Sequence, residues 1–130
     1  MATKPGSGQL DATRRRKAER RGQWAEVAAE LVLRLKGYRV LARRYKTPLG
    51  EIDLIARRGR RLAFVEVKRR ATEDEALEAI TPRLRGRVRR AAELWMQRYD
   101  PAGRWEPAFD VVAIVPGRWP RHLRDAFPFE

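Results

Sequence analysis

Residues 50–70, GEIDLIARRGRRLAFVEVKRR, are the segment that most constrains the fold of this chain. Two runs rich in aliphatic and β-branched residues flank Gly59 and Arg60, and Gly59 can adopt the positive φ that a type II′ turn needs. The pattern predicts a β-hairpin with strands over 51–57 and 61–68. In this register Asp53 lies opposite Glu66.

The predicted hairpin also gathers charged side chains on one face. Strand alternation puts Glu51, Asp53, Glu66 and Lys68 on the same side, and opposed Cβ atoms lie about 4.5–5.5 Å apart. Two carboxylates repel at that distance unless a divalent cation lies between them. Mg²⁺ typically takes one or two carboxylates together with water and phosphate oxygens. Metal-dependent phosphodiester chemistry is one interpretation. The other is a Glu51–Lys68 surface ion pair, with Asp53 and Glu66 solubilising an exposed sheet.

The charge balance narrows the choice of partner. The chain has 30 Lys and Arg against 17 Asp and Glu, a formal net charge of +13. Such an excess favours a polyanion through counterion release at phosphates, and nucleic acid is the expected partner. A basic but merely soluble surface, or a ribosome-associated protein without chemistry, is the alternative.

Composition excludes several classes of site. There is no cysteine and a single histidine, His122, so disulfides, thiolate nucleophiles and cysteine-ligated zinc are excluded. The chain has no phosphate-binding GxxxxGK[ST] motif. Its N-terminus lacks the apolar stretch of a signal peptide, and no apolar run approaches the length of a membrane span. A cytoplasmic protein is expected.

Patterning beyond the hairpin predicts a basic flexible N-terminal arm over 1–21 and one domain over 22–130. A helix over about 23–36 ends at Gly37, a strand covers 38–45, and a short helix is placed within 70–81. A longer helix begins at the cap Thr81-Pro82 and ends near Tyr99. A strand follows at 108–115, and the tail 116–130 adds an edge strand. The fold class is therefore α/β, with the order α-β-β-β-α-β and a mixed sheet flanked by helices.

Hydrophobic spacing predicts which helix faces are buried. The first helix has an apolar stripe of Trp24, Val27, Ala28, Leu31 and Leu35. The second long helix is expected to bury the apolar residues Leu84, Val88, Ala91, Ala92, Trp95 and Tyr99. Its opposite face is basic.

Motifs in this chain resemble a known family. Asp53 followed by Glu66-Val67-Lys68 across a hairpin resembles the core of the PD-(D/E)XK, or restriction-endonuclease-like, superfamily. The segments GEIDLIA at 50–56 and FVEVKRR at 64–70 are similar to those of the YraN-like family of small bacterial proteins, which is related in fold to Holliday-junction resolvases. Further matching segments extend the resemblance over about residues 21–127. It implies a restriction-endonuclease-like core.

The resemblance also implies roles for particular residues. Asp53 and Glu66, with the backbone carbonyl of Val67, would bind Mg²⁺ or Mn²⁺. Lys68 would position or deprotonate the attacking water or stabilise charge on the phosphate. Glu26 would be an accessory ligand from the first helix, or else a solvated glutamate.

These roles predict a metal-dependent endonuclease that hydrolyses DNA, with branched or flapped DNA as the expected substrate in repair or recombination. The residues expected to contact nucleic acid are Arg69, Arg70, Arg83, Arg87 and Arg90. The alternative is a nucleic-acid-binding or ribosome-associated protein that keeps the fold without catalysis. By analogy with resolvases a homodimer is expected, with the apolar tail around Phe127 as its contact.

Overall fold

The computed structural model describes residues 23–129, so the predicted arm over 1–21 lies outside the described residues. A five-stranded sheet has the order β1-β2-β3-β4-β5. The strands are β1 (Arg39–Thr47), β2 (Gly50–Arg58), β3 (Arg61–Arg69), β4 (Glu106–Ile114) and β5 (Arg121–Phe127). Two helices, α2 (Glu73–Glu78) and α3 (Pro82–Tyr99), connect β3 to β4. A further helix covers 23–35. The pair β3–β4 is parallel and the other pairs are antiparallel, so the expected mixed α/β sheet is confirmed.

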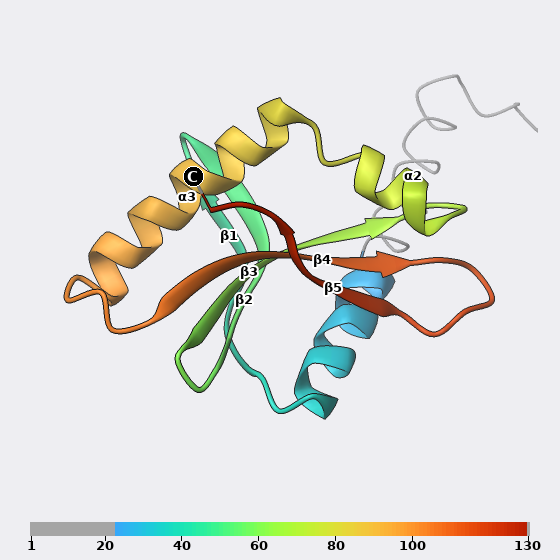
Figure 1. Ribbon diagram of the computed structural model, residues 1–130, viewed down its shortest axis with the longest axis horizontal. Helices are drawn as coiled ribbons and strands as arrows, with labels where there is room; N and C mark the ends of the chain where they lie inside the picture. The colour runs from blue at the N-terminus through green and yellow to red at the C-terminus, as the bar shows by residue number, and fades with distance from the viewer. Residues whose placement is uncertain (1–22, 130) are drawn as a thin grey trace, which may run out of the picture.

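Helices cover both faces of the sheet. Figure 1 shows α3 on one side and the helix over 23–35 on the other. On the α3 side, Val88 and Trp95 pack with Phe64 and Phe109 of the sheet. On the opposite side, the buried cluster comprises Ala29, Leu33, Tyr38, Leu54, Ala56, Ala63, Val65 and Val112. Burial on both faces explains the unbroken apolar runs LAFV at 62–65 in β3 and VVAI at 111–114 in β4. None of the helices within 23–129 is long and apolar enough to cross a membrane.

The helix over 23–35 buries a different face from the one predicted. Trp24 and Leu35 are 73% and 76% exposed, and Val27 and Leu31 are also exposed. The residues that contact the interior are Ala25, Ala29, Val32 and Leu33. The prediction followed the largest side chains, but the alanines let the helix axis approach the sheet closely. Only the neighbouring stripe therefore meets the core.

Helix α3 follows its prediction more closely. Thr81 caps it by accepting a hydrogen bond from the backbone N–H of Leu84, and Pro82 occupies the first turn. Val88 and Trp95 are buried as expected. Tyr99 was expected to be buried and is 52% exposed, because it lies at the last residue of the helix, beyond the edge of the core.

Two glycines shape the hairpin. Gly59 has a φ of +60°, which confirms its predicted role in the turn. At Gly50 a Cβ would lie 2.2 Å from the backbone carbonyl oxygen of Arg87. Only a hydrogen fits there, so α3 packs its backbone directly against the start of β2. This close approach brings the N-terminal turns of α3 beside the acidic residues of the hairpin.

The C-terminal tail forms the predicted edge strand, β5, and belongs to the core. Phe127 is only 6% exposed and stacks on Phe109 with ring centroids 4.6 Å apart. The ring of Phe127 is therefore already covered by the protein's own side chains and is not free for a dimer contact. A homodimer that uses the tail around it stays a prediction.

A buried ionic cluster joins β5 to the rest of the sheet. Asp110 is fully buried and accepts hydrogen bonds from Arg61 at 2.5 and 2.7 Å. It also contacts Nε2 of His122 at 2.6 Å and accepts from the backbone N–H of Asp125 at 3.0 Å. The single histidine thus belongs to this structural cluster.

Candidate metal centre

The acidic residues meet where strands β2 and β3 separate. Their ladder runs from Arg58–Arg61 to Leu54–Val65 in the predicted register and goes no further toward Asp53. Oδ2 of Asp53 accepts a hydrogen bond from the backbone N–H of Val67 at 2.8 Å. The predicted ladder pairs Asp53–Glu66 and Glu51–Lys68 are therefore not formed. The carboxylate of Asp53 bonds to the β3 backbone in their place.

Strand β1 is also irregular beside Asp53. Arg44 has a φ of +47°, a left-handed conformation that few residues other than glycine adopt. The flanking pairs Arg43–Leu54 and Tyr45–Ile52 place this kink opposite Asp53. The pairing of β2 with β1 and its pairing with β3 are thus both irregular at the position of Asp53.

The separated strands open a cavity of about 420 Å³. It is lined by all four residues that the sequence analysis assigned to catalysis, by Val67, and by two of the arginines predicted to contact nucleic acid. The complete lining is Ala25, Glu26, Glu51, Asp53, Glu66, Val67, Lys68, Arg69, Arg70 and Leu84. The helix over 23–35, β2, β3 and α3 all contribute to this one site.

The electrostatics of the carboxylate pair favour a bound cation. Burial raises the pKa of Asp53 and of Glu66, and their mutual repulsion adds to the rise at Glu66, whereas the ammonium of Lys68 acts in the opposite sense. Without a cation the pair therefore retains a proton at neutral pH. A divalent cation can replace that proton and neutralise both carboxylates.

The donor set fits Mg²⁺ or Mn²⁺. Within residues 23–129 no group of three or more His, Asp or Glu side chains could hold a metal ion. The possible metal ligands are therefore the two carboxylates of Asp53 and Glu66, together with the backbone carbonyl of Val67 that the family resemblance implies. Mg²⁺ commonly binds through one or two carboxylates and completes its shell with water and substrate phosphate. The site therefore suits a metal that arrives with a phosphate.

Removing one carboxylate should stabilise the metal-free protein. A pKa raised by folding contributes stability that is present below the unfolded pKa and is lost as the pH rises through the folded pKa. Glu66→Gln abolishes this loss, so we expect about 1–2 kcal/mol of added stability at pH 8 in EDTA. At pH 4 the gain should vanish. Urea denaturation at both pH values measures the difference, and equal effects at the two pH values would contradict the charge argument.

Glu26 lines the cavity but already has a partner. Its Oε2 accepts a hydrogen bond from Nε of Arg44 at 2.7 Å, and a quarter of its side chain is exposed. This bond occupies only one of its two oxygens, so Glu26 can keep it and still accept a hydrogen bond from a metal-bound water through Oε1. The structure thus places Glu26 beside Asp53 and leaves its role as a ligand a prediction.

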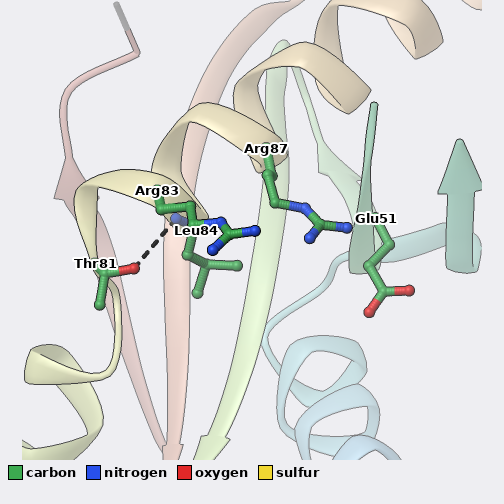
Figure 2. A pocket seen from close by; sticks show the side chains of 5 residues that line it. All are labelled: Glu51, Thr81, Arg83, Leu84 and Arg87. Carbon is green, nitrogen blue, oxygen red and sulfur yellow. Dashed lines mark hydrogen bonds between the residues drawn. The ribbon is translucent and has the colours of Figure 1, made fainter. Parts of the chain in front are cut away.

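The five predicted nucleic-acid contacts divide into three groups. Arg69 and Arg70 line the acidic cavity. Arg83 and Arg87 line a neighbouring cavity, and Figure 2 shows both side chains extending from α3 on the side of Glu51. Arg90 is exposed and lines neither of these two cavities.

Sequence reasoning missed the contribution of β1. Lys46 lies opposite Glu51 in the β1–β2 ladder and lines a cavity together with Asp53. Pairing β1 with β2 across the turn at residues 48–49 is what brings this lysine to the site. The kink at Arg44 had no comparable signal in the sequence.

Comparison with known proteins identifies the family of this chain. The model of the uncharacterised protein family UPF0102 matches residues 25–114. A UPF0102 protein of Parvibaculum lavamentivorans is 58% identical over 110 residues, covering 85% of this chain and 83% of that protein. UPF0102 proteins of Methylorubrum extorquens and Rhizobium meliloti are 56% and 51% identical, covering 90% and 88% of this chain and 91% and 94% of their own lengths. The YraN-like resemblance is thereby confirmed, and the chain belongs to the UPF0102 family.

Proposed function

We propose that this protein is a metal-dependent endonuclease that hydrolyses DNA. The observation that supports this most is the pair formed by the half-buried Asp53 and the buried Glu66, with raised pKa values, in one cavity with Lys68. A protein that only bound nucleic acid would gain nothing from two adjacent carboxylates withdrawn from water, which repel phosphate. Basic residues around the cavity and a net charge of +13 supply attraction to the polyanion.

The residues divide the chemical work. Asp53 and Glu66 would hold the cation, and the hydrogen bond from Val67 fixes the orientation of Asp53. A cation held there would lower the pKa of a bound water and neutralise charge on the phosphate. Lys68 contacts the phosphate or the attacking water, where its ammonium stabilises developing negative charge.

The proposed hydrolysis forms one P–O bond and breaks another. The hydroxyl of water adds to phosphorus, the ester P–O bond on the opposite side breaks, and the departing oxygen takes up a proton. Branched or flapped DNA, met by a cytoplasmic protein during repair or recombination, is the substrate class that the resemblance to resolvases favours.

Cleavage of defined DNA tests the function. Linear duplex, single-stranded, flapped and four-way DNA should be incubated with the wild-type protein in Mg²⁺, in Mn²⁺ and in EDTA. We expect metal-dependent cleavage of at least one substrate and none in EDTA. Binding of all four substrates with no cleavage in either metal would exclude the enzyme and favour the non-catalytic nucleic-acid-binding alternative.

A further inference from the structure

The acidic cavity lies between two other cavities. On the α3 side it shares Glu51 and Leu84 with a cavity of about 240 Å³, and on the β1 side it shares Glu26, Glu51 and Asp53 with one of about 190 Å³. The three adjoin to form a trough that runs from β1, across the separated ends of β2 and β3, to the first turns of α3. The two carboxylates that hold the proposed cation lie in its middle part.

Positive side chains line both ends of the trough. Lys46 lines the β1 end, and Arg83 and Arg87 line the α3 end. All three are exposed, and none of the hydrogen bonds or ion pairs found among residues 23–129 involves their side chains. In Figure 2 the side chains of Arg83 and Arg87 extend from the same side of α3.

The other arginines of α3 do not share this position. Arg85 points to the opposite side of the helix, where its guanidinium lies 5.2 Å from the centroid of the Phe127 ring. Arg98 lies at the far end of α3, against Tyr99. Arg90 lies on the same face of α3 as Arg83 and Arg87, one turn further along, and lines none of the three cavities.

We propose that the trough binds a polynucleotide strand that continues past the reacting phosphate in both directions. Lys46 contacts a phosphate on one side, and Arg83 and Arg87 contact a phosphate on the other. Because phosphates recur along a strand, cations on both sides of the acidic pair fit a reacting phosphate that has a neighbouring phosphate on each side. A strand that ended at the acidic pair would leave the cations on one side without a phosphate. This inference rests on the proposed function and adds the path of the strand and the cations that hold it on each side of the reacting phosphate.

Glu51 gives the trough an opposing charge. It lines all three cavities, and its carboxylate is exposed. A phosphate that passes this position meets its negative charge, so Glu51 weakens the binding of the strand. Glu51→Gln should therefore tighten binding, whereas loss of a trough cation should weaken it.

Binding without cleavage tests the trough. The affinity for a single strand of about 20 nucleotides is measured by fluorescence anisotropy in EDTA at several salt concentrations. Lys46→Ala, Arg83→Ala and Arg87→Ala should each weaken binding by about 3- to 10-fold and lower the salt slope by about one. Arg98→Ala removes an equal charge from the same helix and should change affinity less than about twofold. If Lys46→Ala or the arginine variants bind no more weakly than Arg98→Ala, the trough is not the strand's path.

Closed DNA tests the proposed function, and the anisotropy series tests the trough separately. Circular single-stranded DNA and supercoiled plasmid have no ends, and we expect the wild-type protein with Mg²⁺ or Mn²⁺ to cut at least one of them. If a circle is cut while the trough variants bind as tightly as the wild type, the endonuclease function stands and the trough is wrong. If linear DNA is degraded only from its ends while both circles stay intact, both the endonuclease function and the two-sided trough are wrong. If no DNA is cut, the function fails, and the anisotropy series alone decides whether the strand lies in the trough.

Discussion

Lys68→Ala should slow DNA cleavage severely while leaving its dependence on metal intact. The ammonium lies in the same cavity as the two carboxylates and lowers their pKa values, so its charge acts directly on the reacting centre. Loss of such a group costs about 10²- to 10⁴-fold in rate. The rate of cleavage as a function of Mg²⁺ concentration measures both quantities. The Mg²⁺ concentration for half-maximal rate should not rise, since the lost ammonium repels the cation.

Asp53→Asn should change both the cleavage rate and the Mg²⁺ concentration that gives half-maximal rate. The asparagine oxygen can still accept the hydrogen bond from Val67, so the local backbone is kept, but half of the carboxylate pair is lost. The rate should fall at least as far as in Lys68→Ala, and the metal concentration required should rise. Arg104→Ala is the charge control for Lys68→Ala, since it removes the same charge and Arg104 is exposed and precedes β4, at the end of the sheet away from the cavity. Equal activity of Asp53→Asn and wild type would overturn the assignment of the site.

The second large effect concerns stability. Asp110→Asn should destabilise the protein by about 3–5 kcal/mol, because it leaves Arg61 without its compensating charge. The Arg61 side chain is only 14% exposed, and its two hydrogen bonds to Asp110 are charge-assisted. Urea denaturation should show a lower midpoint at an unchanged slope.

An exposed partner of the same arginine supplies the control. Asp125 also pairs with Arg61, at 3.2 Å, but its side chain is 73% exposed. Asp125→Asn should cost at most about 1 kcal/mol, as surface ion pairs do. Asparagine also tolerates the positive φ of 50° at this position. Similar losses in both variants would show that burial of Asp110 is not the cause.

The pH dependence of stability should follow Asp110. Burial by itself raises the pKa of this carboxyl, but Arg61, His122 and the backbone N–H of Asp125 together hold it well below its ordinary value. A depressed pKa contributes stability that is present above the unfolded pKa and lost as the pH falls toward the folded one. The wild-type protein should therefore lose stability below about pH 4, and Asp110→Asn should lose much less over that range.

The hairpin shows what local pattern can predict. Alternation, the turn at Gly59 and the motif residues gave the correct register for five pairs of residues and placed Asp53, Glu66 and Lys68 in one cavity. These properties depend on residues close together in the chain. Where the strands part at Asp53, pattern failed, because a side chain bonds to the neighbouring backbone in place of the ladder.

The first helix shows the opposite case. Its periodicity was correct and its buried face was wrong, since hydrophobic spacing alone cannot tell two adjacent apolar stripes apart. Ala25 and Ala29 are buried because close approach to the sheet requires small side chains. Which stripe meets the sheet depends on the packing of distant segments.

The sequence by itself determined the elements, the hairpin register, the acidic motif and the family, because each depends on local spacing or on local residue identity. Only the tertiary structure decided that Lys46 and the α3 arginines border the acidic cavity, that Phe127 is covered, and that His122 belongs to the Asp110 cluster. These relations join residues far apart in the chain. They arise from close packing, as at Gly50 where α3 meets β2.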